Sequence, residues 1–299
     1  MSRSQKGYFY AGLATLCWST VASAFKLTLS YLQNDVFTML FYSVLFSLII
    51  LFLTVLFQGK GREIFNVSAK GIVSSMLFGL INPFLYYIIL FKSYSLLPGQ
   101  EAQPLNYTWP VMLTLLSVPL LRQKMKWVHL LGILVSFGGV LVISARGRIR
   151  SLSLTHWQGI LLALSSAVVW ACYWIFNLRD RREATIKLFM NFCFGFLYIA
   201  VTLCLIQGIA LPPWKGLVGT LWVGFFEMGL TFIFWMKALE YAESTSIVSN
   251  VVYLSPFISL IFLKVVVGEQ LFFSSILGLI LIVAGILIQI SKPKNLFSN

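Results

Sequence analysis

The residue whose position most strongly suggests a chemical role is Glu227, because it is the only carboxylate near the middle of a long apolar stretch. Burial disfavours the ionised form of a carboxylate, and ionisable groups placed so deep are functional by default. We therefore interpret Glu227 as a group that carries a proton or binds the ammonium group of a ligand. The alternative is a neutral glutamic acid that hydrogen-bonds a neighbouring helix, for example through Asn82.

Two polar stretches, 98–110 and 244–256, also interrupt apolar sequence. Read as a helix, the first places its polar and aromatic residues at i, i+3, i+7 and i+10, on one face. These residues are Gln100, Gln103, Tyr107 and Pro110, and the second stretch offers Ser246, Ser249, Asn250 and Tyr253. An unpaired amide in hydrocarbon is costly, so we expect the two faces to form opposite walls of one polar cavity.

Aromatic rings gather with amides on further helix faces. In the stretch 158–178 the spacing i, i+3, i+4, i+7 brings three rings and an amide onto one face, formed by Trp170, Tyr173, Trp174 and Asn177. Further candidate cavity residues are Trp18, Asn82, Tyr86 and Trp235. Rings stack on planar ligands or attract cations while amides fix the ligand's orientation. The alternative is that these rings only pack helices or mark the membrane interfaces.

Composition indicates which elements must position these residues. The chain is 59% hydrophobic and 10% charged, against about 25% charged in soluble domains, and its mean hydropathy is +0.89. This is the composition of an all-α polytopic membrane protein. Apolar runs long enough to span a bilayer predict about ten transmembrane helices, at 7–27, 36–57, 71–92, 98–121, 127–145, 158–178, 185–207, 215–237, 244–264 and 271–290.

Other classes of protein are not supported. The net charge of +13 comes from basic residues that occur singly or in short groups at helix ends, which indicates topology signals and not a nucleic-acid site. The four cysteines lie inside apolar runs and form neither a CxxC motif nor a Cys/His cluster, so we expect no disulfide and no metal site. His129 and His156 lie at helix ends without a serine or cysteine partner. We expect neither an enzyme nor a cofactor.

The sequence repeats itself at a nearly constant interval. Gly79, Asn82 and Lys92 match Gly224, Glu227 and Lys237 at an offset of 145, and Tyr107-x-x-Pro110 matches Tyr253-x-x-Pro256 at an offset of 146. We therefore predict two five-helix repeats around a central cavity, at 1–145 and 158–291, with a connecting segment at 146–157 and a cytoplasmic tail at 292–299. An odd number of helices in each repeat requires the two repeats to be inverted relative to each other.

The distribution of Lys and Arg predicts the orientation of the chain. With the N-terminus inside, 15 of the 22 basic residues fall on the cytoplasmic side, which leaves 7 outside. We therefore expect both termini to be cytoplasmic and the protein to lie in the inner (plasma) membrane. The basic segment Arg146–Arg150 runs against this rule, and the sequence offers no account of it.

The runs 127–145 and 271–290 have glycines in place of polar side chains. Gly132 and Gly139 match Gly278 and Gly285 at an offset of 146. Small residues let helix backbones approach closely in a membrane, so these two helices are expected to pack together or to form the contact of a homodimer.

Several motifs resemble those of the drug/metabolite transporter superfamily, EamA type, over nearly the whole chain. They are Gly7-x10-Trp18-Ser followed by Lys26, Phe91-Lys-Ser-Tyr94 with its copy Met236-Lys-Ala-Leu-Glu-Tyr241, the paired Tyr-x-x-Pro motifs and Gly268-Glu269. Within that superfamily the chain is most similar to YddG-type exporters of amino acids. The resemblance implies a cavity among the helices at 7–27, 71–92, 98–121, 158–178, 215–237 and 244–264, with Trp18, Tyr86, Trp109 and Trp170 in its walls. It assigns no role to Glu227.

We predict a secondary transporter that exports aromatic or other neutral amino acids, or similar small metabolites, by alternating access of the two repeats. One alternative keeps the fold but takes up or exchanges a cationic or nucleotide-like metabolite, with Glu227 pairing the cation and tryptophans stacking on a flat ring. Another is a membrane protein that transports nothing and acts as a chaperone or an assembly subunit. The partners expected are a small-molecule substrate and the lipid bilayer.

Overall fold

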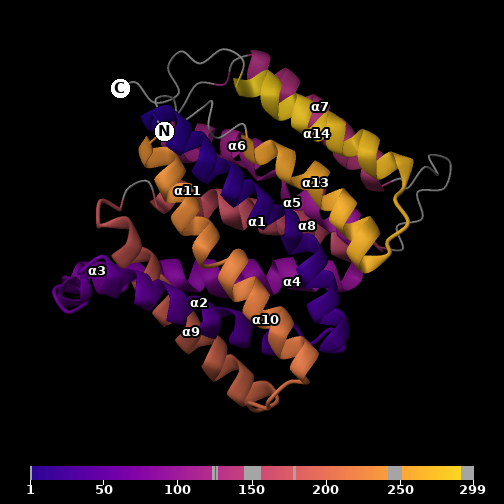
Figure 1. The fold of residues 1–299 in the computed structure, drawn as a ribbon. Helices are drawn as coiled ribbons and strands as arrows, with labels where there is room; N and C mark the ends of the chain where they lie inside the picture. Colours follow the sequence, from indigo (N-terminus) through magenta and orange to yellow (C-terminus); the bar gives the residue numbers. More distant parts are fainter. Residues whose placement is uncertain are drawn as a thin grey trace.

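The computed structural model describes residues 2–122, 125, 127–144, 156–177, 180–241 and 251–290, and every regular element in these residues is helical. The first half contains α1 (Arg3–Tyr31), α2 (Val36–Phe57), the 3₁₀ turn η1 (Gly61–Ile64), α3 (Ala69–Gly79), η2 (Leu80–Leu85), α4 (Tyr86–Leu96), α5 (Gly99–Asn106), α6 (Trp109–Leu121) and α7 (Trp127–Ser144). The second half contains α8 (Trp157–Asn177), α9 (Ala184–Ile206), α10 (Trp214–Phe226), α11 (Leu230–Tyr241), η4 (Val251–Leu254), α13 (Ser255–Phe262), η5 (Leu263–Val267) and α14 (Phe273–Ile290). Figure 1 shows how these helices are arranged.

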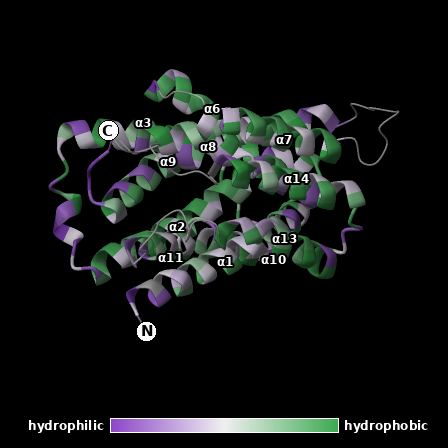
Figure 2. Cartoon of the chain, turned by 90° about the horizontal axis from the view of Figure 1, so that it is seen from above, coloured by the Kyte–Doolittle hydropathy of each residue, from purple (hydrophilic) through white to green (hydrophobic). Residues whose placement is uncertain are grey.

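The surface of the helices is apolar. In the described part of the chain, 6 helices are long and apolar enough to cross a membrane, and shorter apolar helices cover 251–267 and 273–289. Large apolar side chains point outward, for example Leu134 at 61% exposure and Leu141 at 66%. Figure 2 shows that hydrophilic residues concentrate at helix ends and in connections. A surface of this kind requires a bilayer as solvent, so the protein is a multi-pass membrane protein.

Three of the expected helices are interrupted, at the positions of their prolines or polar residues. Asn82 has non-helical torsion angles (φ −145°, ψ 120°) before Pro83, inside the π-helical η2. The helix expected at 98–121 stops at Asn106 and resumes at Trp109, and the helix expected at 215–237 breaks between α10 and α11. Proline removes a backbone donor and clashes with the preceding turn, which explains the first two breaks. The prolines Pro83, Pro104 and Pro110 predict the first two breaks from the sequence, whereas the third break has no proline and was not predicted.

The glycine-rich helices α7 and α14 lie side by side at one edge of the molecule (Figure 1). A Cβ atom added to Gly139 would lie 2.5 Å from the carbonyl oxygen of Gly278, so the two backbones are in direct contact. The Ser136 hydroxyl donates a hydrogen bond of 3.2 Å to the Ile282 carbonyl. The glycine faces are thus used inside one chain. The homodimer expected through these helices stays a prediction, and it would have to use their outer faces.

Replacing Gly139 by alanine should lower the free energy of unfolding by about 1–3 kcal/mol, because the methyl group overpacks the contact with α14. Gly138 is a matched control on the same helix, since a Cβ there meets nothing within 4 Å. Gly138→Ala should be neutral or slightly stabilising, because alanine favours helix. Thermal unfolding of the purified variants in detergent measures both. If both substitutions changed the free energy of unfolding equally, the close contact between Gly139 and α14 would be contradicted.

Polar side chains at one end of the bundle join segments distant in sequence. The Arg182 guanidinium donates to the Gly71 carbonyl and to the Ser75 hydroxyl, both at 2.8 Å, and forms an ion pair with Asp180 at 2.6 Å. Lys60 pairs with Glu183 at 2.9 Å. Asp180 therefore orients the arginine that links the connection after α8 to helix α3.

The ion pair predicts a pH dependence of stability. Partial burial opposes ionisation of Asp180, but hydrogen bonds from the Arg182 side chain and backbone outweigh it and lower the pKa below 3.8. Because the folded protein binds this proton more weakly than the unfolded chain, the stabilisation is complete above pH 3.8 and is lost as the pH falls below that value. Asp180→Asn should therefore unfold at a lower temperature than wild type at pH 7, by an amount equivalent to about 1–3 kcal/mol.

The difference between wild type and Asp180→Asn should shrink as the pH falls from 4 towards about 3. Thermal unfolding across this range measures it, and Arg182→Ala should remove the same pH dependence, since its guanidinium is the cause. A difference between wild type and Asp180→Asn that stays constant down to pH 3 would rule out the ion pair as its source.

Candidate functional site

A cavity of about 130 Å³ lies among helices from both halves of the chain. Its lining is formed by Trp18, Val21, Phe25, Tyr86, Leu90, Tyr94, Gln103, Asn106, Tyr107, Trp109, Trp170, Trp174, Glu227, Phe232, Trp235, Val252 and Tyr253. Cavities of about 150 Å³ in proteins bind benzene. The space therefore accommodates a ligand built around roughly one six-membered ring.

Most of the residues predicted for the site lie in this lining. They are Trp18, Tyr86, Gln103, Tyr107, Trp109, Trp170, Trp174, Glu227, Trp235 and Tyr253. They come from helix segments that are far apart in the sequence, as the expectation of two facing walls requires. Whether they contact a ligand stays a prediction.

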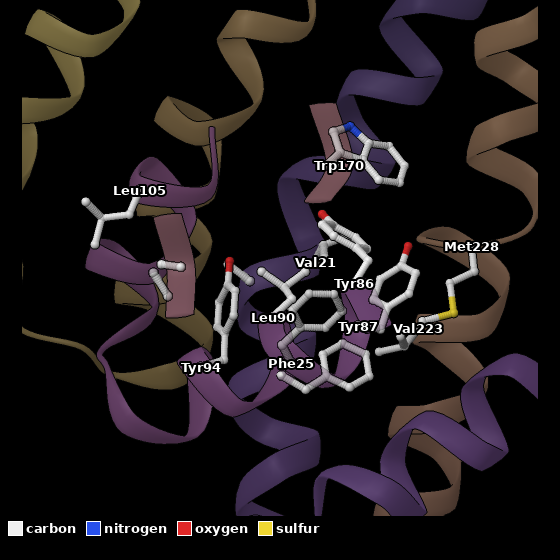
Figure 3. Packing of buried hydrophobic residues seen from close by; sticks show 14 of the residues in the cluster. Val21, Phe25, Tyr86, Tyr87, Leu90, Tyr94, Leu105, Trp170, Val223 and Met228 are labelled. Carbon is white, nitrogen blue, oxygen red and sulfur yellow. The ribbon is translucent and has the colours of Figure 1, made fainter. Parts of the chain in front are cut away.

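The rings form a continuous aromatic cluster around Trp170. Tyr86 lies with its ring centroid 4.6 Å from that of Trp170, and Tyr173 stacks on the same indole at 5.6 Å. Figure 3 shows Tyr86 and Tyr87 beside Trp170. Across the cavity, Trp18 contacts Trp235 at 5.7 Å. Centroid separations of this size are those of aromatic side chains that pack on one another, and the members of the cluster that line the cavity can also stack on a planar group or attract a cation.

Glu227 lies at the break between α10 and α11 and is only 9% exposed. Its Oε1 atom accepts a hydrogen bond of 3.1 Å from the Tyr87 hydroxyl, while Oε2 has no partner among the described residues. The break itself is bridged by Thr231, whose hydroxyl donates to the Phe226 carbonyl. Asn82, the example of a partner given for the alternative reading, does not pair with Glu227. Tyr87 was not predicted, because the helical spacing singled out its neighbour Tyr86.

Amides supply the other polar groups of the cavity. Asn106 donates to the Ser166 hydroxyl at 2.9 Å and accepts from the Tyr86 hydroxyl at 3.5 Å. The Oε1 atom of Gln103 and the indole nitrogen of Trp174 are buried without a partner in the described part of the chain. Asn106 was missed because it falls off the helical face that contains Gln103 and Tyr107. The cavity thus offers both donors and acceptors.

Four predicted residues lie outside the lining. Gln100 instead bridges two parts of the chain, because its side chain donates to the Gln270 carbonyl at 2.7 Å and accepts from the Phe272 amide at 2.8 Å. Asn82 and Tyr173 lie near Asn191 in a separate buried region, where the side-chain amides of Asn82 and Asn191 have no hydrogen-bond partner among the described residues. Asn177 also lies away from the lining.

A fifth predicted residue, Asn250, lies outside the described residues. Among the residues that are described, no group of three or more His, Cys, Asp and Glu side chains is arranged to hold a metal ion.

The fold and the cavity define a class of protein. A multi-pass membrane protein whose helices break around a small cavity of rings, amides and one carboxylate has the architecture of a membrane transport protein. Comparison with family models then identifies the family. The model of the EamA-like transporter family matches residues 5–145 and again residues 157–291, so the chain belongs to that family.

Individual relatives are distant. The chain is 25% identical over 219 residues to the uncharacterized transporter YvbV of Bacillus subtilis, covering 72% of this chain and 70% of the relative. It is 26% identical over 153 residues to the aromatic amino acid exporter YddG of Ancylobacter novellus, covering 51% of this chain and 52% of that protein. A crystal structure superposes with a TM-score of 0.66 over 96% of both chains at 22% identity, which shows the fold alone.

The hydrogen bond from Tyr87 to Glu227 can be measured by a double-mutant cycle. The two single variants are Tyr87→Phe and Glu227→Ala. The change in the free energy of unfolding of the double variant should differ from the sum of the two single changes by about 1 kcal/mol or more. Tyr42→Phe is the matched control, because its hydroxyl donates at the same distance of 3.1 Å to the Ala210 carbonyl, away from the cavity. Tyr42→Phe and Glu227→Ala should be additive. Additivity of the Tyr87 pair would show that the hydrogen bond is absent.

Proposed function

We propose that this protein is a secondary transporter that exports aromatic or other neutral amino acids, or similar small metabolites, across the inner membrane. The observation that carries the proposal is the ring-sized cavity, in which Glu227 and a cluster of indole and phenol rings from both halves converge. The relative from Ancylobacter novellus named as an aromatic amino acid exporter supports the choice of substrate. We also propose that the ten predicted residues that line the cavity contact the substrate.

The proposal includes ten membrane crossings in two inverted halves, with both termini in the cytoplasm. Two observations support it. The family model matches the chain twice, in 5–145 and in 157–291. The interruptions also recur at the same spacing, since Asn82 and Glu227 both lie at helix breaks, and Pro110 and Pro256 both lie in the first turn of a resumed helix. Matched breaks in two halves are typical of transporters built from inverted repeats.

Two sets of hydrogen bonds join the halves, one near each end of the long kinked helix 69–96. We propose that alternating access breaks and reforms these sets in turn. At one end, Arg182 holds the Gly71 carbonyl. At the other, Glu269 accepts hydrogen bonds from the amides of Gly99 and Gln100 at 2.7 and 3.2 Å. Opening the cavity to one side of the membrane requires one of these sets to break while the other holds. Glu227, between them, is the proposed site of proton coupling.

Purified protein in proteoliposomes should exchange radiolabelled phenylalanine with saturable kinetics, and an imposed pH gradient should drive net flux. Glu227→Gln should abolish the pH-driven component, because glutamine cannot bind or release a proton, while the variant still folds. The measurement is uptake with and without the gradient. Absence of saturable transport for every amino acid in a panel would overturn the amino-acid assignment.

The matched control for this experiment is Glu240→Gln. Glu240 is an exposed carboxylate on the same helix, α11, and does not line the cavity. Its replacement should leave both the exchange and the pH dependence unchanged. A Glu227→Gln variant with the wild-type response to pH would remove this residue from proton coupling.

A further inference from the structure

The described residues that line the cavity can contribute negative charge but no positive charge. Of the described residues that line it, Glu227 is the only carboxylate, and none is lysine, arginine or histidine. Lys26 follows the lining residue Phe25, but its ammonium group donates to the Tyr94 and Leu97 carbonyls at 2.9 and 3.0 Å and does not join the lining. The segment 242–250, outside the described residues, contains Glu243 and no basic residue.

We propose that this cavity recognises the ammonium group and the ring of its ligand and makes no ionic contact with a carboxylate, so that a primary arylalkylamine binds more tightly than the amino acid of the same ring. This inference rests on the proposed function, since it concerns the same cavity. It narrows the preferred ligand class to small aromatic amines.

The ammonium end has acceptors prepared for it. Glu227 Oε2 and Gln103 Oε1 are buried acceptors without a partner in the described part of the chain, and both residues line the cavity. A buried acceptor left unpaired is costly, and an ammonium group supplies three donors. Trp18, Trp170 and Trp235 line the same cavity, and indole faces attract cations.

The ring end is set by volume and by shape. A cavity of about 130 Å³ leaves room for roughly one six-membered ring beside the Tyr86 and Trp170 rings. A short alkyl chain connects such a ring to the ammonium group.

A carboxylate on the ligand has no basic partner among the described residues that line the cavity. Neutral donors such as the Trp174 indole nitrogen, which has no partner among the described residues, can hydrogen-bond it. They do not neutralise its charge, and burying an anion without a cation is costly. An ionised Glu227 in the same cavity adds repulsion between like charges. Removing the carboxylate from an amino acid should therefore strengthen binding.

Three ligands with the same ring test the proposal, namely 2-phenylethylamine, phenylalanine and 3-phenylpropionate. Isothermal titration calorimetry on the purified full-length protein in detergent should give a Kd for the amine about tenfold lower than that for phenylalanine, and no saturable binding of the propionate. Glu227→Gln should weaken binding of the amine by roughly tenfold or more, while Glu240→Gln leaves it unchanged. N-acetyl-2-phenylethylamine, which is neutral, should bind wild type and Glu227→Gln alike.

Two results would overturn the inference. One is tighter binding of phenylalanine than of the amine, and the other is binding of the propionate as strong as that of the amine. Counterflow in proteoliposomes separates this inference from the proposed function. If the amine binds more tightly than phenylalanine but no ligand is transported, the transport function is contradicted and the inference stands. Saturable flux of phenylalanine with weaker binding of the amine contradicts the inference alone.

Discussion

The structure depends on one constraint, that a polar group inside a bilayer must be paired within the protein or face a cavity. Helix breaks expose backbone groups, and here two of them occur beside the cavity. Tyr107 follows the end of α5, and Glu227 follows the end of α10, and both line the same space. The break at Glu227 leaves the Phe226 carbonyl without its helical partner, and the Thr231 hydroxyl donates a hydrogen bond to it. The positions of the breaks therefore determine where a ligand can bind.

This constraint explains how much of the site could be predicted from the sequence. Helical spacing in 98–110 placed Gln103 and Tyr107 together, and both line the cavity, since α5 is helical from Gly99 to Asn106 and Tyr107 is its C-cap. The same spacing failed for Gln100, whose partners, Gln270 and Phe272, lie about 170 residues away in the sequence. Only the packing of the whole chain brings these residues together, and no local pattern reports such packing.

The break at Asn82 explains why Asn82 and Tyr87 were assigned wrongly. In a continuous helix Asn82 and Tyr86 would share a face, since they are four residues apart. The non-helical torsion angles of Asn82 rotate the helix before the break relative to the helix after it. Asn82 therefore joins Tyr173 and Asn191, while Tyr86 faces the cavity and Tyr87 reaches Glu227. A periodic pattern holds within a helix but loses its phase across a break.

The contacts between the two halves differ in kind, and the difference favours one division between fixed and moving parts. At α7 and α14, backbone meets backbone through Gly139 and Gly278, and close packing of this kind leaves no room for sliding. At the start of α5, the halves are held by hydrogen bonds from two amides to the Glu269 carboxylate, and each such bond adds only about 1.5–3 kcal/mol net. Bonds of that strength can break and reform within a transport cycle. In the proposed cycle, the glycine edge is therefore expected to stay packed, and the hydrogen bonds to Glu269 are expected to be among those that break and reform.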